Sequence, residues 1–574
     1  MNDAIYMGEM EQAYEKIFSA WLNKKPLPDF PQEPAQVTEK LAEEYIKRAK
    51  YYIPLENKHG DSDYKRVDFK RTLYYAELAA QCDSKRDAQL YFIIADRRYM
   101  LDENIGAYKA MHKAMEYLRE GKGYSEVFAL ECHRKLATYA QENRRHVEST
   151  ENYARAFELA AEERTKLEIY DGWLLSLHFI DISSAEMAAV HFDYQKFFED
   201  IKPFTTYHKR HARIKVGYIS GDFRKHAAFS VVFGFISCHD RSKFEITCYS
   251  LNIVDDEFTK LYKRGVEHFV DVQNLSSAEL AKKIHDDEID IAVDLAGHTG
   301  HNGLPALVYR PAPVQVSGIG YMSTTGLKQI DYFITDESLD PPNQNREQYF
   351  SEKFLYMPAQ FSYAQRMDLP NPSGAPCMKN GYVTFGTICR FSKITDDMLA
   401  VWTEILNRVP NAKLLMRARA FISNSTAEEL YHIMKNLGCD MDRVIIRPAI
   451  KDYFGAISQL DICLDSYPYV GGATTLDALY MSVPVITLYG ERHSTRFGRS
   501  ILNSVGLSEL AVDNVDAYIN TAVALANDFE TLDLLHKNLR GMFLNSDALN
   551  PQKYCKLLEQ KFTEILEANH EKFD

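Results

Sequence analysis

Glycine, threonine and acidic residues gather in the segment 461–490, where a β-branched run is followed by a helix-type pattern. The small and hydroxylated positions there are Gly471, Gly472, Ala473, Thr474 and Thr475. Glycine lets the backbone approach a ligand closely, and the first amides of a helix are unpaired donors that attract an anion. Asp477 follows within that helix and is placed to accept hydrogen bonds from ribose hydroxyls. The segment predicts a phosphate-and-ribose pocket, and the alternative is an ordinary glycine turn with a threonine N-cap.

Two cationic residues lie at the end of an earlier β-branched run, just as the glycine-rich segment follows its own run. Arg390 lies near the end of the β-branched run 383–391, and Lys393 follows directly after it. Cationic side chains in this position project toward a bound ligand and are able to neutralise a leaving diphosphate. Taken alone, the same two residues fit solvated surface charges.

Three histidines follow other β-branched runs. His226 lies in the turn SGDFRKHAAFS, and His298 and His301 lie in DLAGHTGHNGLP. A histidine at the carboxyl end of a strand can act as a general base or hydrogen-bond a substrate oxygen. A helix-capping or surface role is the alternative for His226, and a structural role is open for either of the other two.

Several familiar motifs are absent from the sequence. The chain has no G-x-G-x-x-G at either first strand-to-helix turn and no G-x-x-x-x-G-K-[ST], so dinucleotide redox chemistry and nucleotide hydrolysis lose support. No metal-ligand cluster stands out, and the nine cysteines form no C-x-x-C pair. We therefore expect reduced, mostly buried thiols and chemistry that uses neither a metal nor a cofactor.

The elements that must position these residues differ between the two parts of the chain. Residues 1–205 carry apolar positions three and four residues apart, with alanines where two helices would touch. This pattern predicts helical pairs similar to tetratricopeptide pairs. The distance from Tyr108 to Tyr153 exceeds the roughly 34 residues of that repeat, so we predict an array of helical pairs without a fixed repeat.

From residue 213 onward, short β-branched runs alternate with helices, which predicts parallel, doubly wound sheets. The stretch 367–381 is rich in Pro, Gly and Asn and predicts a linker, after which the alternation restarts. We expect an α/β fold with two Rossmann-like domains, 206–375 and 376–574, after an all-α domain. Ligands of such domains bind at the carboxyl ends of the strands. The last helix, 551–568, is expected to cross back onto the first of the two domains.

Composition limits the classes of partner. The chain has 574 residues, 26% of them charged, and a formal net charge of −14, which disfavours nucleic acid as a ligand. The opening segment carries acids and lacks a basic start before an apolar stretch, and no window reaches the roughly 18 apolar residues of a membrane span. We expect a soluble, cytoplasmic protein.

Several longer runs together resemble a known family. The succession RPAPVQ, GY, DYFITD and YFSEK, with GDFRKHAAFS before it and DICLDSYPYVGGATTLDALY after it, is similar to the bacterial relatives of the O-linked N-acetylglucosamine (O-GlcNAc) transferases. The resemblance covers about residues 205 to 570. It implies a GT-B fold, a UDP-sugar donor, a protein acceptor and inversion at the anomeric carbon.

The resemblance also implies roles by position. It places His226 beside the donor sugar and the acceptor hydroxyl, Lys393 on the diphosphate, Thr474 at the phosphate-binding helix start, Asp477 on the ribose and Tyr453 on the uracil. His298, His301 and Tyr321 are candidate contacts to the sugar or the acceptor. This sequence has Arg390 where animal members have Gln, and Gly472-Ala473 where they have His-Thr. Contacts to the sugar are therefore less well defined than contacts to UDP.

These expectations combine into one predicted function. The chain would be a metal-independent, inverting glycosyltransferase that moves GlcNAc or a related hexose from a UDP-sugar substrate to Ser or Thr hydroxyls of a protein held by the helical domain. One alternative is an Asn-directed protein N-glucosyltransferase that uses UDP-glucose. Another is a non-catalytic helical-repeat scaffold. Assembly into a homo-oligomer stays open.

Overall fold

The computed structural model describes residues 37–56, 63–121, 123–252, 254–364, 369, 371–547 and 549–573. The acidic opening segment considered above lies outside these residues. The chain forms two compact units, one drawn from 1–101 and 110–122 and the other from 102–109 and 123–574. None of the described helices is both long enough and apolar enough to cross a membrane. The cysteines are free thiols, most of them buried.

The first unit is helical. Its helices are α2 (Glu39–Glu56), α3 (Asp63–Ala79), α4 (Ala88–Met100) and most of α5 (Asn104–Glu120). Ala42, Ala49 and Ala76 are buried, as the predicted close contact of helical pairs requires. The rings of Tyr52 on α2 and Tyr75 on α3 are stacked with their centroids 6.2 Å apart.

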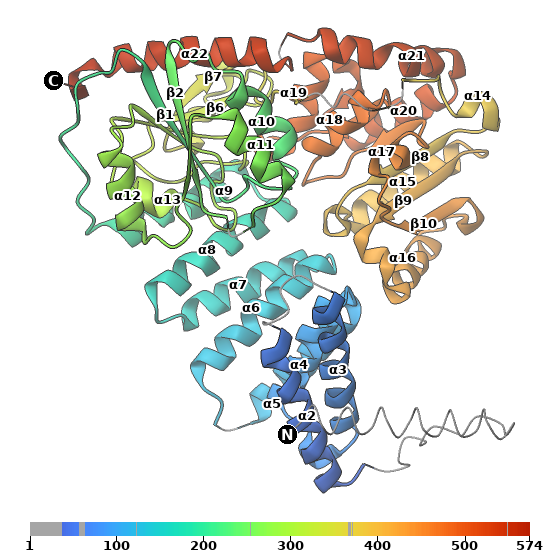
Figure 1. Ribbon diagram of the computed structural model, residues 1–574. Coiled ribbons are helices and arrows are strands. Elements are labelled where there is room, and N and C mark those ends of the chain that lie inside the picture. Colours follow the sequence, from blue (N-terminus) through green and yellow to red (C-terminus); the bar gives the residue numbers. More distant parts are fainter. Residues whose placement is uncertain are drawn as a thin grey trace, which may run out of the picture. The chain divides into compact units, whose positions relative to one another are not determined.

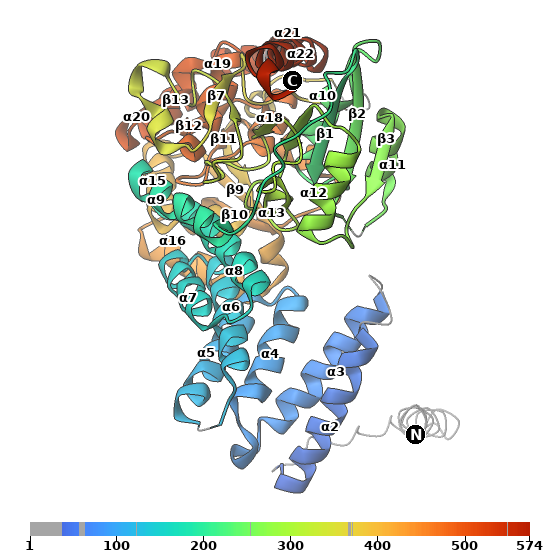
Figure 2. The same cartoon turned by 90° about the vertical axis from the view of Figure 1, so that its left-hand side faces the viewer.

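The second unit begins with more helices. They are α6 (Glu126–Glu142), α7 (His146–Leu159), α8 (Glu163–Ser176) and α9 (Ser184–Phe192). In both views they form a row that leads to the sheet domains (Figures 1 and 2). The N-cap of α9 is a capping box, in which Ser183 and Glu186 satisfy each other's backbone amides.

Two parallel sheets follow within the same unit. The strands of the first are β1 (Ile214–Ser220), β2 (Phe244–Ser250), β3 (His268–Asp271), β4 (Ile291–Asp294), β5 (Val314–Ser317), β6 (Tyr332–Thr335) and β7 (Lys353–Tyr356). Their order is β3-β2-β1-β4-β5-β6-β7. The helices that accompany them are α10 (Phe229–Ser237), α11 (Glu257–Gly265), α12 (Ser277–Asp286) and α13 (Leu304–Leu307). The chain changes direction across the sheet between β1 and β4, where α/β proteins bind ligands.

The second sheet repeats this topology. Its strands are β8 (Thr384–Ile388), β9 (Lys413–Ala418), β10 (Val444–Pro448), β11 (Ile462–Leu464), β12 (Val485–Leu488) and β13 (Ala511–Val512), in the order β10-β9-β8-β11-β12-β13. Its helices are α14 (Cys377–Asn380), α15 (Asp396–Arg408), α16 (Asn424–Asn436), α17 (Tyr453–Ile457), α18 (Ala473–Tyr480), α19 (Phe497–Ser504), α20 (Val515–Ala526) and α21 (Phe529–Asn545). The change of direction lies between β8 and β11.

The last helix, α22 (Pro551–Ala568), packs on the first sheet domain, as predicted. Its Tyr554 ring lies 5.6 Å from that of Phe235 on α10, and Pro551 contacts Gly234. Figure 1 shows α22 along the first domain and α21 along the second. The expected fold class, a helical region followed by two Rossmann-like domains, is confirmed. The division after residues 205 and 375 stays our proposed one.

Candidate active site

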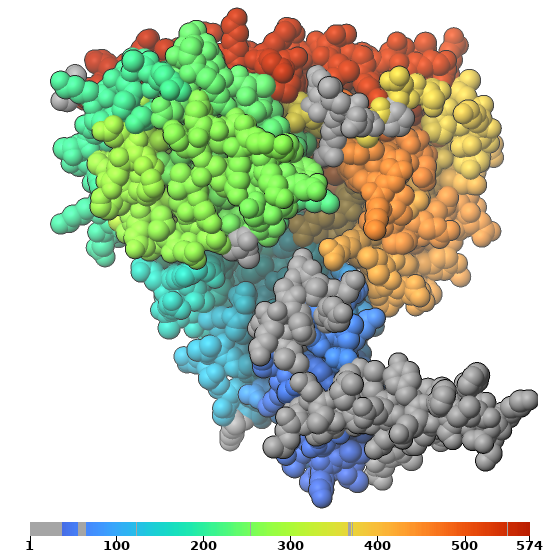
Figure 3. All heavy atoms as spheres, viewed as in Figure 1, coloured from blue at the N-terminus to red at the C-terminus, as the bar shows by residue number. Residues whose placement is uncertain are grey.

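The predicted site residues follow the two strands at which each sheet changes direction. His226 follows β1, His298 and His301 follow β4, Lys393 follows β8, and Gly471 follows β11. The molecular surface is hollowed between the first sheet domain and the second, drawn green and orange (Figure 3). The alternation of strands and helices was visible in the sequence, but the strand order that joins these turns was not.

Lys393 is a half-buried cation of the second domain. Its ammonium nitrogen lies 4.0 Å from the centroid of the Tyr469 ring and donates a hydrogen bond of 3.3 Å to the Val470 carbonyl oxygen. Burial lowers the pKa of Lys393 to about 8. An ammonium group has three N–H donors, so this side chain suits a bound anion, whose charge would restore the protonated form.

Arg390 is arranged differently. Its guanidinium is largely exposed and forms an ion pair of 2.7 Å with Glu142 on α6. Exposed pairs of this kind contribute little to stability. Arg390 nevertheless acts on His226 of the first domain, whose pKa it helps to lower, so the two side chains face the same space.

The glycine turn after β11 is held by Asp465. One carboxylate oxygen accepts from the amides of Ser466 at 2.9 Å and Gly471 at 2.8 Å, and the other accepts from the Thr487 hydroxyl at 2.8 Å. A Cβ on Gly471 would lie 2.6 Å from the Thr475 hydroxyl oxygen, so the turn has no room for a side chain. Sequence reasoning did not assign Asp465 a role; its signal was an acid at a strand end, six residues before the glycine.

The turn leads into α18, whose first residue is Ala473. Its N-cap is Gly472, and no side chain caps the helix. A cavity here is lined by Cys389, Tyr453, Asp465, Thr474 and Thr475, among other residues. The structure therefore brings Tyr453 to the same cavity as the uncapped helix start, which is an anion site in type.

Asp477 is buried on α18. Its carboxylate accepts a hydrogen bond of 2.7 Å from the hydroxyl of Tyr363, and the residue is 7% exposed. Tyr363 comes from the chain that leaves the first domain, and sequence reasoning did not detect it. Asp477 keeps its place on the helix that begins at the cavity, and its ribose role stays a prediction.

His226 lies in the turn after β1. Its Nδ1 accepts from the Ala228 amide at 3.3 Å and lies 3.3 Å from the Asp222 carboxylate. Burial lowers the pKa of His226, and Asp222 opposes this effect. In the tautomer in which Nδ1 accepts from the Ala228 amide, Nε2 carries the proton and can donate to a substrate oxygen. In the tautomer in which Nδ1 donates to Asp222, Nε2 can accept a proton.

The three candidate sugar contacts lie in different surroundings. The Nδ1 of His298 lies 2.7 Å from Asp171, and its Nε2 lies 2.9 Å from the Thr325 carbonyl oxygen. Tyr321 is buried, and its hydroxyl lies 2.8 Å from His191. Both side chains are therefore engaged in holding α8 and α9 against the first sheet. His301 is exposed, with φ of 58°, and packs on Gly221.

A family model described as "Glycosyl transferase family 41" matches residues 187–369 and 377–558. The chain belongs to this family. The expected relationship to O-GlcNAc transferases is thereby confirmed at the level of the family.

The chain is also similar in sequence to individual proteins. A probable UDP-N-acetylglucosamine–peptide N-acetylglucosaminyltransferase of Arabidopsis thaliana, SPINDLY, is 36% identical over 358 residues, which are 61% of this chain and 39% of that protein. Another Arabidopsis protein of this description, SEC, is 31% identical over 365 residues, which are 61% of this chain and 37% of its own. The chain thus matches less than half of the length of these relatives. They are plant proteins, so the bacterial subgroup stays a prediction.

A solved structure extends the likeness to most of the fold. The structure of a Thermobaculum terrenum O-GlcNAc transferase mutant superposes with a TM-score of 0.79 and 24% identity, and covers 91% of this chain and 99% of that one. The shared fold includes the helical region as well as the two sheets.

Proposed function

We propose that this chain is an inverting glycosyltransferase that moves GlcNAc from UDP-GlcNAc to Ser or Thr hydroxyls of a protein. The observation that carries the proposal is the half-buried Lys393 beside the uncapped start of α18, at the carboxyl ends of β8 and β11. Together they offer an ammonium group and free amides to a leaving diphosphate. The names of the plant relatives support the donor and the acceptor.

The chemistry follows from these groups. The acceptor oxygen attacks the anomeric carbon from the face opposite UDP, the bond to the β-phosphate oxygen breaks, and the configuration inverts. Lys393 and the α18 amides stabilise the negative charge that develops on UDP. His226, with its proton on Nε2, positions a sugar or acceptor oxygen. The hydroxyl proton passes to the departing diphosphate.

The helical part would bind the polypeptide acceptor, because arrays of helical pairs present extended surfaces. Neither a cofactor nor a catalytic metal enters this scheme. Two groups of possible metal ligands occur among the described residues, and neither contains a residue of the predicted site.

A UDP-release assay tests the proposal. Lys393→Ala is expected to lower turnover by about 10²-fold, the usual cost of losing one preorganised charge contact. Lys413→Ala is a matched control, because the Lys413 ammonium also lies over a tyrosine ring, at 4.2 Å from Tyr382, but Lys413 begins β9, whereas Lys393 follows the carboxyl end of β8. Equal activity of both variants would contradict the assignment. Comparing UDP-GlcNAc with UDP-glucose separates the proposed donor from that of an N-glucosyltransferase.

A further inference from the structure

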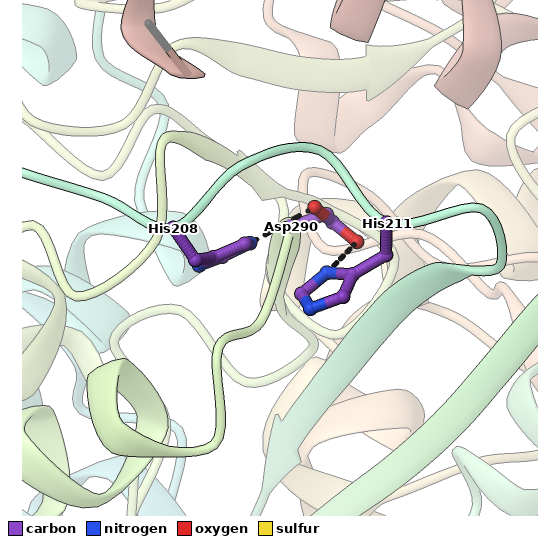
Figure 4. A group of neighbouring side chains, drawn as sticks. All are labelled: His208, His211 and Asp290. Atoms are coloured by element: carbon purple, nitrogen blue, oxygen red, sulfur yellow. Dashed lines mark hydrogen bonds and ion pairs between the residues drawn. The ribbon is translucent and has the colours of Figure 1, made fainter.

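Three side chains that could together bind a metal ion, His208, His211 and Asp290, lie close to one another in the first sheet domain (Figure 4). His208 and His211 precede β1, and Asp290 directly precedes β4, so all three lie at the amino ends of strands. The Nε2 of His208 is 3.0 Å from one Asp290 oxygen, and the Nδ1 of His211 is 3.1 Å from the other. Asp290 is fully buried, and the two histidines are partly exposed.

The separations between these atoms suit a small cation. A tetrahedral zinc ion with bonds of about 2.0–2.1 Å keeps its ligand atoms about 3.3 Å apart. The two nitrogen–oxygen distances fall within a few tenths of an ångström of that value, and the ligand atoms of all three residues lie within 4.8 Å of one another. The two imidazole rings already lie with their centroids 4.4 Å apart. Small side-chain rotations would bring all three groups onto one ion.

The surroundings of the group also resemble the outer contacts of a metal site. The remaining ring nitrogen of His211 lies 3.2 Å from the Glu288 carboxylate, and the Lys215 amide donates to Asp290 at 2.7 Å. Metal-binding histidines usually donate their second N–H to a carboxylate, which fixes the tautomer and the ring orientation. Glu288 stands in that position. With the metal on Nδ1, the proton of His211 would lie on Nε2 and point to Glu288.

We propose that His208, His211 and Asp290 bind one divalent transition-metal ion, with zinc as the best match. Two imidazoles and one carboxylate are ligands that zinc accepts, and a water molecule would complete four-coordination. The ion would join the segment before β1 to the start of β4. It therefore stabilises the entry into the first sheet and takes no part in sugar transfer.

A second group of this kind does not support the same proposal. His239, Cys555 and Glu559 also lie close together. The His239 ring is completely buried, with one nitrogen 2.7 Å from the Tyr218 hydroxyl and the other 3.0 Å from Glu559. The difference from the first group is burial: the side chains of His208 and His211 are 10% and 23% exposed, so a metal-bound water could reach them, whereas the His239 ring is enclosed by protein.

The test uses the full chain, freed of any affinity tag and treated with a chelator. Zn²⁺ is titrated by calorimetry, and Co²⁺ is used as a spectroscopic probe of the ligand geometry. We expect one ion per chain, visible absorption typical of tetrahedral Co²⁺, and a melting temperature that rises with Zn²⁺ concentration. His208→Ala and His211→Ala should each abolish these effects. Glu288→Gln should weaken binding about 10- to 100-fold, the usual cost of losing an outer contact.

His268→Ala is the matched control, because His268 also contacts a carboxylate, Glu245 at 3.2 Å, but belongs to no group of three possible metal ligands among the residues that the structure describes. It should bind Zn²⁺ like the unaltered chain. The proposal is overturned if the unaltered chain binds Zn²⁺ no more tightly than the His208→Ala, His211→Ala double variant. It is also overturned if His268→Ala loses as much binding. UDP release should be the same with and without the ion, so this result is independent of the proposed activity.

Discussion

At the scale of single residues, the first prediction concerns how the protonation of Lys393 sets the pH dependence of activity. Its pKa of about 8 means that the ammonium form, present at neutral pH, is lost as the pH rises through 8. We expect kcat/KM for the sugar donor to fall above about pH 8. Lys393→Arg should retain some activity and lose this alkaline limb, because a guanidinium stays charged. An unchanged alkaline limb in the variant would show that another group titrates.

His226 makes the second prediction at this scale. Burial lowers the pKa of this ring, and in the tautomer that we propose Nδ1 accepts from the Ala228 amide and Nε2 donates. His226→Ala should therefore weaken binding of intact UDP-GlcNAc about 10-fold and leave binding of UDP unchanged, as measured by calorimetry. The wild-type profile should have no acidic limb near pH 6.5. Loss of such a limb in the variant would instead identify His226 as the base.

How far sequence predicts a residue's role depends on where its partners lie. The threonines and glycines near α18 could be predicted as a site because their residue types and spacing are local to one segment. His298 was predicted as a ligand contact because it follows a β-branched run, and its contact with Asp171, 127 residues away in the sequence, was not visible there. The partner of Arg390, Glu142, is 248 residues away. Composition and spacing carry no information on such pairs.

At the scale of elements, the turn between β11 and α18 makes the third prediction. Gly471→Ala would place a methyl group 2.6 Å from the Thr475 hydroxyl oxygen and 2.7 Å from that of Thr474. We expect the start of α18 to shift and UDP affinity to fall at least 10-fold. Gly541→Ala in α21 is the control, since its added methyl group meets no atom within 4 Å. Unchanged UDP affinity in Gly471→Ala would remove this turn from the donor site.

The turn between β11 and α18 also shows which features of the fold the alternation of strands and helices predicts. Alternating strands and helices predicted two sheets, and local types predicted a phosphate-binding turn. The turn's geometry depends on Asp465, whose bonds to Gly471 and Thr487 form only when β11 and β12 are neighbours. Strand order is a tertiary property, so a single sequence does not state it.

At the scale of the larger compact unit, the helical segment before the first sheet contacts the proposed donor site. The ring of Phe179, between α8 and α9, has its centroid 4.7 Å from that of Tyr469 and 5.0 Å from that of His146. The Lys393 ammonium in turn lies over the face of the Tyr469 ring. Arg492, after β12, also donates to the carbonyl oxygens of Leu177 and Ile180. Helices predicted to hold the acceptor thus also pack behind Lys393, the lysine that we propose binds the diphosphate.

This contact makes the last prediction. Phe179→Ala removes the support behind Tyr469 and admits water near Lys393, so the pKa of that lysine should rise toward its ordinary value. We expect turnover to fall about 10-fold and the alkaline limb of the pH profile to move above pH 8. Phe179→Leu should restore most of the turnover, because it refills most of the volume. The control is Phe192→Ala on α9, whose ring is 37% exposed. A Phe179→Ala variant that loses thermal stability but keeps its pH profile would assign Phe179 to packing alone, because only a change at Lys393 moves that limb.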